Sequence, residues 1–412
     1  MKTTTRLQLS LMMFLEFFTW GAWFVTLGTY LIHNLDASGG QMASVFSTQS
    51  WGAIIAPFII GLIADRYFNA EKILGVLHIA GALLMYQMYQ TSDISIFYPY
   101  VFVYMILFMP TLALVNSISF NQMKDPEKEF SSIRIFGTIG WIIAGLLISF
   151  AFLWDAEENI RMGLLKNTFL MAAVASAILG VFSFTLPKTP PRVARGAKVR
   201  IGEMLGLDAL KLLKDKNFSI FFIASVLICI PLAFYYQNAN PFLSGIGMEN
   251  PTGKMTIGQM SEVFFLLLLP LFFKKFGFKK TILVGMLAWA VRYALFAYGD
   301  AGDLSFMLII GIALHGICYD FFFVSGQIYT DSKAGTQYKS AAQGLITLAT
   351  YGVGMLIGFE IAGWITDIYK TSESAFNWKM IWIIPSMIAL VVFILFALFF
   401  NEKKENNIQS NL

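Results

Sequence analysis

The sequence predicts an all-α membrane protein in which twelve transmembrane helices form two pseudo-symmetric six-helix bundles. Of its 412 residues, 57% are hydrophobic and only 13% are charged, whereas a soluble domain carries about 25% charged residues. The apolar residues come in long blocks, each near or above the roughly 20 residues that a helix needs to cross a bilayer. A basic segment in the middle of the chain separates six of these blocks from the other six.

The order of the blocks gives the order of the predicted spans. The first block follows Lys2 and Arg6 and is too long for the core of a signal peptide, so we expect it to be retained as the first membrane helix. By residue number, the predicted spans are 7–32, 42–64, 73–91, 95–120, 131–154, 166–186, 217–245, 256–273, 279–299, 304–330, 340–368 and 378–400.

The charges of the connecting segments predict the orientation. The segments on one side hold most of the lysines and arginines, and those on the opposite side hold only Arg161, Lys166, Lys254, Lys370 and Lys379. The basic side is expected to be cytoplasmic. Together with the even number of spans, this places both termini in the cytoplasm.

The same pattern divides the chain into four parts. We expect an N-terminal six-helix bundle over 1–186, a cytoplasmic linker over 187–216, a C-terminal six-helix bundle over 217–400 and a cytoplasmic tail over 401–412. The linker is rich in lysine and arginine, and leucines recur between Glu203 and Lys214. An amphipathic helix on the inner membrane face and a solvated basic linker both fit this segment.

Ionisable side chains inside the apolar blocks carry the functional signal. A charge at membrane depth costs roughly 2.5 kcal/mol or more and usually faces a cavity or a partner. Such residues indicate a polar path through the membrane and therefore a transporter. They are Glu16, Arg134, Glu262, Arg292 and Asp320, with His78 and His315.

Other functional classes lack their signatures. The sequence has no G-x-x-x-x-G-K-[S/T] loop, so ATP-driven transport would need another subunit. Cys229 and Cys318 lie in apolar spans and are expected to be apolar fillers. The histidines and cysteines have no metal-ligand spacing, and we expect neither a metal nor another cofactor. The net charge of +4 does not indicate a nucleic-acid partner.

Arg134, Thr138 and Trp141 share one face of the fifth span, because they stand at i, i+4 and i+7. A guanidinium, a hydroxyl and an indole in one row suit a polar solute that contains a ring. The alternative is that Arg134 only marks the cytoplasmic end of this span.

Two pairs in the second half also share helix faces. Gln259 and Glu262 stand at i and i+3, which suits a hydroxyl-rich ligand, and a carboxylate at this depth suits proton coupling. A structural hydrogen-bonded pair is the alternative. His315 and Tyr319 stand at i and i+4, whereas Asp320 faces elsewhere. Asp320 is either an ion-pair partner of Arg292 or a second proton carrier.

The seventh span is unusually polar, with Tyr236 and Gln237 as candidate ligands of the solute. Pro231 and Pro241 are expected to interrupt its hydrogen-bond ladder, and irregular backbone at membrane depth is tolerated where it lines a cavity. The alternative is that this stretch is only the outer end of the helix. The role of Glu16 is open at this point, as is that of Glu360 in the eleventh span.

Several segments carry a resemblance to known transporters. Gly61-Leu-Ile-Ala-Asp-Arg66 resembles the G-x-x-x-D-R loop of the major facilitator superfamily, without the usual basic residues downstream. More specific blocks resemble the nucleoside:proton symporter family of that superfamily, which includes bacterial nucleoside and xanthosine permeases. These blocks are Phe14–Ile32, Ile133–Trp141, Leu205–Ala209, Arg292–Asp300 and Ser340–Gly344.

The resemblance implies the major facilitator fold and a nucleoside site at the centre of the protein. It places Arg134, Thr138 and Trp141 on binding positions of the fifth span, and it places Gln259 and Glu262 on the pair that binds ribose or base and couples protons. Tyr319 falls on an aromatic binding position and Asp320 on the acidic residue beside it.

The sequence departs from the family pattern at three other positions. His315 stands where the nucleoside permease has a tyrosine. Ala233 and Tyr236 stand where the family has a glutamine and an asparagine. Two amide contacts to the solute are thereby lost. Either Gln237 or Asn238 compensates for them, or the preferred nucleoside differs.

The expected function is proton-coupled nucleoside uptake across a bacterial inner membrane by alternating access, not enzymatic catalysis. The expected partners are a nucleoside, a proton and the lipid bilayer, and we expect the protein to function as a monomer. One alternative is a secondary transporter of another polar solute, such as a modified nucleoside, a nucleobase or a sugar. A transporter-like receptor is the alternative of another class.

Overall fold

The computed structural model describes residues 2–60, 67–125, 129–191, 207–372 and 375–401, and for 336–340 only the backbone. The described chain is almost entirely helical, and its only strand-like pairing is an isolated bridge between Lys370 and Phe376. It packs into two compact units, Met1–Arg200 with Glu249–Thr256, and Ile201–Met248 with Ile257–Leu412. The Gly61–Arg66 motif and the start of the predicted linker helix lie outside the described residues.

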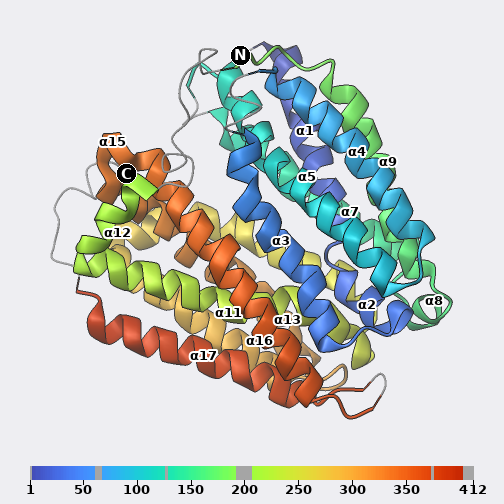
Figure 1. Ribbon diagram of the computed structural model, residues 1–412. Helices are drawn as coiled ribbons and strands as arrows, with labels where there is room; N and C mark the ends of the chain where they lie inside the picture. The colour runs from blue at the N-terminus through green and yellow to red at the C-terminus, as the bar shows by residue number, and fades with distance from the viewer. Residues whose placement is uncertain (1, 61–66, 126–128, 192–206, 373–374, 402–412) are drawn as a thin grey trace. The chain divides into compact units, whose positions relative to one another are not determined.

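The N-terminal unit consists mainly of long helices, drawn from blue to green in Figure 1. The chain turns after Gly21, so the first predicted span is divided into two helices. The elements are α1 (Thr3–Gly21), α2 (Leu27–Leu35), α3 (Gly39–Ile59), α4 (Ala70–Gln90), α5 (Ile94–Gln122), α7 (Ser131–Leu146), the π-helix η2 (Leu147–Ala151), α8 (Glu157–Arg161), the 3-10 turn η3 (Leu164–Lys166) and α9 (Asn167–Ser183).

The C-terminal unit has longer and more interrupted helices. π-Helical segments interrupt two of the predicted spans, directly after Tyr319 and after Thr347. The elements are the 3-10 helix η4 (Leu207–Lys214), α11 (Lys216–Gly245), α12 (Pro251–Tyr298), α13 (Ser305–Ala313), α14 (His315–Tyr319), η5 (Asp320–Val324), α15 (Ser325–Thr347), η6 (Leu348–Gly354), α16 (Met355–Ile368) and α17 (Trp378–Phe399).

Nine helices within the described residues are long and apolar enough to cross a membrane. The helix Pro251–Tyr298 contains two predicted spans, 256–273 and 279–299, so the nine helices contain ten of the twelve. Two helices meet at a kink at Gly277, where φ is 76°, a backbone conformation that residues other than glycine rarely adopt. The predicted spans 7–32 and 42–64 are helical over α1, α2 and α3 but are not among the nine.

Glycines allow the closest helix contacts of the N-terminal unit. A Cβ atom on Gly140 of α7 would lie 2.3 Å from the carbonyl oxygen of Phe14 on α1. Gly75 and Gly180 form a similar contact between α4 and α9, which run side by side in Figure 1. A Cβ atom on Gly75 would lie 2.9 Å from the carbonyl oxygen of Gly180. Small residues at such contacts let helix backbones approach closely, which drives helix association in membranes.

The start of α12 packs within the N-terminal unit. The Asp155 carboxylate accepts a hydrogen bond from the backbone N–H of Thr252 at 3.0 Å, and Ser149 Oγ accepts one from the N–H of Gly253 at 2.7 Å. Ser149 in turn donates to Asp155. These contacts satisfy N–H groups that have no partner inside the helix.

The seventh predicted span differs from the expectation of an irregular backbone. It is one continuous helix, α11, with Pro231 and Pro241 inside it. The carbonyl oxygen of Pro231 accepts a hydrogen bond from the Tyr293 hydroxyl at 2.6 Å. The prolines remove backbone donors but do not break the helix, because neighbouring helices support it.

The described part of the predicted linker helix, η4, packs against α15 of the C-terminal unit. Ala209 is 1% exposed and lies against Ala334, Ala342 and Leu345, which belong to α15. Leu210, next to it, is 43% exposed. This segment is therefore anchored to the C-terminal unit by its small apolar face.

Candidate functional site

The predicted site residues of the N-terminal unit line α7 where it meets α1. The Arg134 guanidinium lies 4.1 Å above the centre of the Phe17 ring, an attractive cation–π arrangement. The Trp141 ring meets the Trp20 ring edge-on, with 5.6 Å between their centres. Arg134, Thr138 and Trp141 are all partly exposed.

Arg292 and His315 form the core of the site in the C-terminal unit. Arg292 is completely buried, and its Nη1 lies 3.1 Å from His315 Nδ1. The guanidinium stacks 3.6 Å from the centre of the Tyr235 ring, which in turn stacks on the imidazole. The alternative in which Arg292 pairs with Asp320 is wrong. Arg292 Nη1 bonds to the imidazole, and Arg292 Nε and Nη2 have no hydrogen-bond partner among the described residues.

This contact fixes the tautomer of His315. A guanidinium carries only donors, so His315 Nδ1 must accept, and the neutral ring carries its hydrogen on Nε2. His315 Nε2 lies 3.8 Å from Glu262 Oε2, beyond hydrogen-bond distance. The ring therefore presents an N–H donor beside a carboxylate, a pair that suits a ligand bearing both acceptors and hydroxyl groups.

Aromatic residues surround this pair. Tyr319 lies next to His315, with 5.9 Å between the ring centres, and shares a 2.7 Å hydrogen bond with the hydroxyl of Tyr351. Tyr236 lies within electrostatic range of Glu262 and Tyr319. The structure thus brings four predicted residues together, Tyr236, Glu262, His315 and Tyr319.

The remaining predicted residues of this unit have different surroundings. Gln259 is partly exposed, one helical turn before Glu262 on α12. Gln237 is fully buried, and neither of its amide atoms has a hydrogen-bond partner among the described residues. Asp320 is 1% exposed, lies within electrostatic range of Glu262, and has one carboxylate oxygen without a partner among the same residues.

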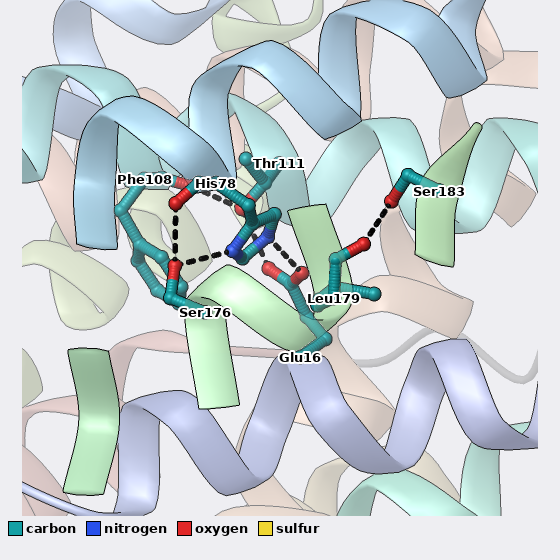
Figure 2. A network of polar contacts seen from close by, with 7 residues as sticks. All are labelled: Glu16, His78, Phe108, Thr111, Ser176, Leu179 and Ser183. Atoms are coloured by element: carbon teal, nitrogen blue, oxygen red, sulfur yellow. Dashed lines mark hydrogen bonds and ion pairs between the residues drawn. The ribbon is translucent and has the colours of Figure 1, made fainter. Parts of the chain in front are cut away.

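The N-terminal unit contains a second group of polar residues, whose contacts with one another could not be predicted from the sequence. Figure 2 shows the His78 imidazole between Ser176 and Glu16. Glu16 is also in contact with Thr111. We call these four residues the Glu16 cluster. Glu16 and His78 stand out in the sequence as ionisable residues in apolar blocks, but no sequence spacing relates residues 62 positions apart.

The described residues contain no group of three or more histidine, cysteine or acidic side chains that could hold a metal ion. Cys229 and Cys318 are both buried as free thiols.

The chain matches the family model of the nucleoside H+ symporters over residues 1–405. It is 44% identical to the protein YegT of Escherichia coli (strain K12), over 98% of this chain and 95% of that protein. It is 32% identical to the xanthosine permease of the same organism, over 95% of this chain and 94% of that protein. Identity to its nucleoside permease NupG is 30%, over 97% of this chain and 96% of that protein.

The fold is similar to solved transporter structures. The crystal structure of the nucleoside transporter NupG superimposes with a TM-score of 0.86 at 30% identity, covering 97% of this chain and all of that chain. The POT family transporter PepTSo shares the fold alone, at 14% identity and a TM-score of 0.71, over 100% of this chain and 99% of that chain.

Proposed function

Because this chain belongs to the nucleoside H+ symporter family, we propose that it takes up nucleosides together with protons, by alternating access across the bacterial inner membrane. The chain is a multi-pass membrane transporter with the major facilitator fold, not an enzyme. The observation that carries the assignment is the match to the family model over residues 1–405.

Solute binding would rest on two kinds of contact. Arg134, Thr138, Gln259 and Glu262 would hydrogen-bond to the ribose or the base, with His315 Nε2–H as a further donor. Trp141, Tyr236 and Tyr319 would stack on the base, a contact worth roughly 1–3 kcal/mol per base in nucleic-acid sites. Gln237, with both amide atoms free of partners among the described residues, would offer the amide contact that Ala233 and Tyr236 do not provide.

Proton coupling would rest on Glu262 and Asp320. The two carboxylates lie within electrostatic range of each other, and like charges at close range disfavour simultaneous ionisation. A proton bound here would favour solute binding, and by linkage the solute would favour the proton equally. We further infer that both termini are cytoplasmic and that the monomer is the functional unit.

The test is uptake of uridine and adenosine into proteoliposomes, with and without an inward proton gradient, for the wild type and Glu262→Gln. We expect accumulation above equilibrium by the wild type with the gradient only, and loss of this accumulation in the variant. Glu249→Gln, a carboxylate substitution outside the predicted spans, should transport like the wild type.

Failure of the wild type to take up either nucleoside would contradict the substrate assignment. A competition experiment, in which free ribose and an intact nucleoside are compared as inhibitors of transport, then separates the possible solutes. A sugar carrier would be inhibited by free ribose as strongly as by the nucleoside. A receptor would bind a nucleoside without accumulating it.

A further inference from the structure

The Glu16 cluster has no part in the function proposed above. It joins four helices of the N-terminal unit, because Glu16 lies on α1, His78 on α4, Thr111 on α5 and Ser176 on α9. None of the four residues is more than 1% exposed. Burying a glutamate and a histidine this deeply costs free energy, so such residues usually form a pair or carry a function.

Hydrogen-bond partners fix the hydrogen atoms around His78 (Figure 2). The backbone carbonyl of His78 can only accept, so the Ser176 hydroxyl donates to it, at 2.9 Å. Ser176 Oγ therefore accepts from His78 Nδ1–H, at 3.0 Å. The 2.8 Å contact between His78 Nε2 and Glu16 Oε2 then contains one shared proton, because two lone pairs would repel each other at this distance.

Thr111 leaves one hydrogen position open. Its hydroxyl oxygen lies 2.6 Å from Glu16 Oε1 and 2.6 Å from the carbonyl oxygen of Phe108, but it carries a single hydrogen. While Glu16 Oε1 is unprotonated, Thr111 donates to it. Once Oε1 carries a proton, this proton is donated to Thr111 Oγ1 and the hydroxyl hydrogen turns to the Phe108 carbonyl.

We propose that the Glu16 cluster is a second proton-binding site, in which Glu16 Oε1 holds the added proton against Thr111. One proton enters, the charge of the cluster rises by one, and the only other change is the rotation of the Thr111 hydroxyl. Each hydrogen-bond contact between the four side chains has a donor and an acceptor in both states.

Within the part of the N-terminal unit that the structure describes, two other ionisable groups on the neighbouring helices are relevant to this site. From α5, the phenol of Tyr104 lies within electrostatic range of Glu16. From α7, the cationic group of Arg134 is directed over the Phe17 ring. Since the cluster is at most 1% exposed, exchange of the proton with water requires movement of the bundle helices.

The test is infrared difference spectroscopy of the full-length protein in lipid bilayers as the pH is lowered. A protonated carboxylic acid has a C=O stretching band that a carboxylate lacks. We expect such a band in the wild type, its loss in Glu16→Gln, and its retention in Glu71→Gln. Glu71 is the matched control because it is a buried carboxylate of the same unit, 2% exposed, which accepts hydrogen bonds from the backbone N–H of Thr189 and from the side-chain amide of Asn69.

A second pair of variants covers the case in which Glu16→Gln does not fold. Thr111→Val removes the acceptor of the added proton and should shift the band to higher frequency, whereas Thr111→Ser keeps the hydroxyl and the band position. Identical spectra for the wild type, Glu16→Gln and Thr111→Val would overturn the proposal. No solute is needed, so this result is independent of the outcome for nucleoside uptake.

Discussion

At the residue scale, the buried ionisable side chains fall into two groups with different surroundings. Glu16 and His78 are closed off from solvent and satisfied by each other and by two hydroxyls. The Glu262 side chain, by contrast, is 25% exposed, and its Oε2 lies 3.8 Å from His315 Nε2. The two groups therefore differ in exposure, and only the second is accessible from outside the protein without a change of conformation.

We expect Arg292 to affect nucleoside binding by orienting His315 rather than by its charge. Arg292→Lys keeps the charge but loses the planar stacking on Tyr235 and the directed donor to His315 Nδ1. We expect roughly fivefold weaker nucleoside binding, the equivalent of one net hydrogen bond of about 1 kcal/mol. Calorimetric titration of the purified protein measures this affinity.

The matched control is Arg161→Lys. The Arg161 side chain is 76% exposed and pairs with Glu157 on the same short helix, so its replacement should leave the affinity unchanged. Equal affinities for Arg292→Lys and the wild type would show that His315 does not depend on Arg292 for its role in binding.

At the element scale, glycines decide how closely the helices of a unit approach. Gly140→Ala would place a Cβ atom 2.3 Å from the Phe14 carbonyl oxygen, so α7 must move away from α1. We expect a loss of about 1–3 kcal/mol of stability, typical of overpacking. Thermal unfolding of the purified protein in detergent measures it as a lower melting temperature.

Gly344→Ala is the control for this substitution. A Cβ atom at Gly344 meets nothing within 4 Å, and alanine favours a helix over glycine by about 1 kcal/mol. Its melting temperature should stay the same or rise. A Gly140→Ala protein as stable as the wild type would mean that the contact between α1 and α7 is not as close as the structure has it.

At the scale of the whole molecule, the resemblance noted in the sequence is confirmed by the family match over residues 1–405, and the all-α transporter fold is confirmed by the solved NupG structure. The orientation in the membrane stays a prediction from the basic residues. It can be tested with single cysteines, because the native Cys229 and Cys318 are buried.

Ser92→Cys and Lys2→Cys probe the two sides. Both positions are exposed, and Ser92 lies in the loop between α4 and α5. On intact spheroplasts, a membrane-impermeant maleimide should label Ser92→Cys, and it should label Lys2→Cys only after permeabilisation. The reverse pattern would place the N-terminus outside and contradict the positive-inside assignment.

The sequence by itself determined the class of the protein, the approximate position of its spans and the residues that break their apolar character. Composition and block length are local properties of the chain, and the cost of a charge in a bilayer holds wherever the helix packs. For this reason Glu262, Tyr236, His315 and Tyr319 could be selected in advance, and the structure brings these four together.

Only the tertiary structure decided the partners. Glu16 meets His78, Arg292 meets His315 instead of Asp320, and α11 stays continuous through Pro231 and Pro241. These outcomes depend on the rotation of each helix and on its packing against helices distant in sequence, which no periodicity along one span encodes. The hydrogen position proposed at Thr111 depends on the packing of α1 against α5, which brings Glu16 to Thr111.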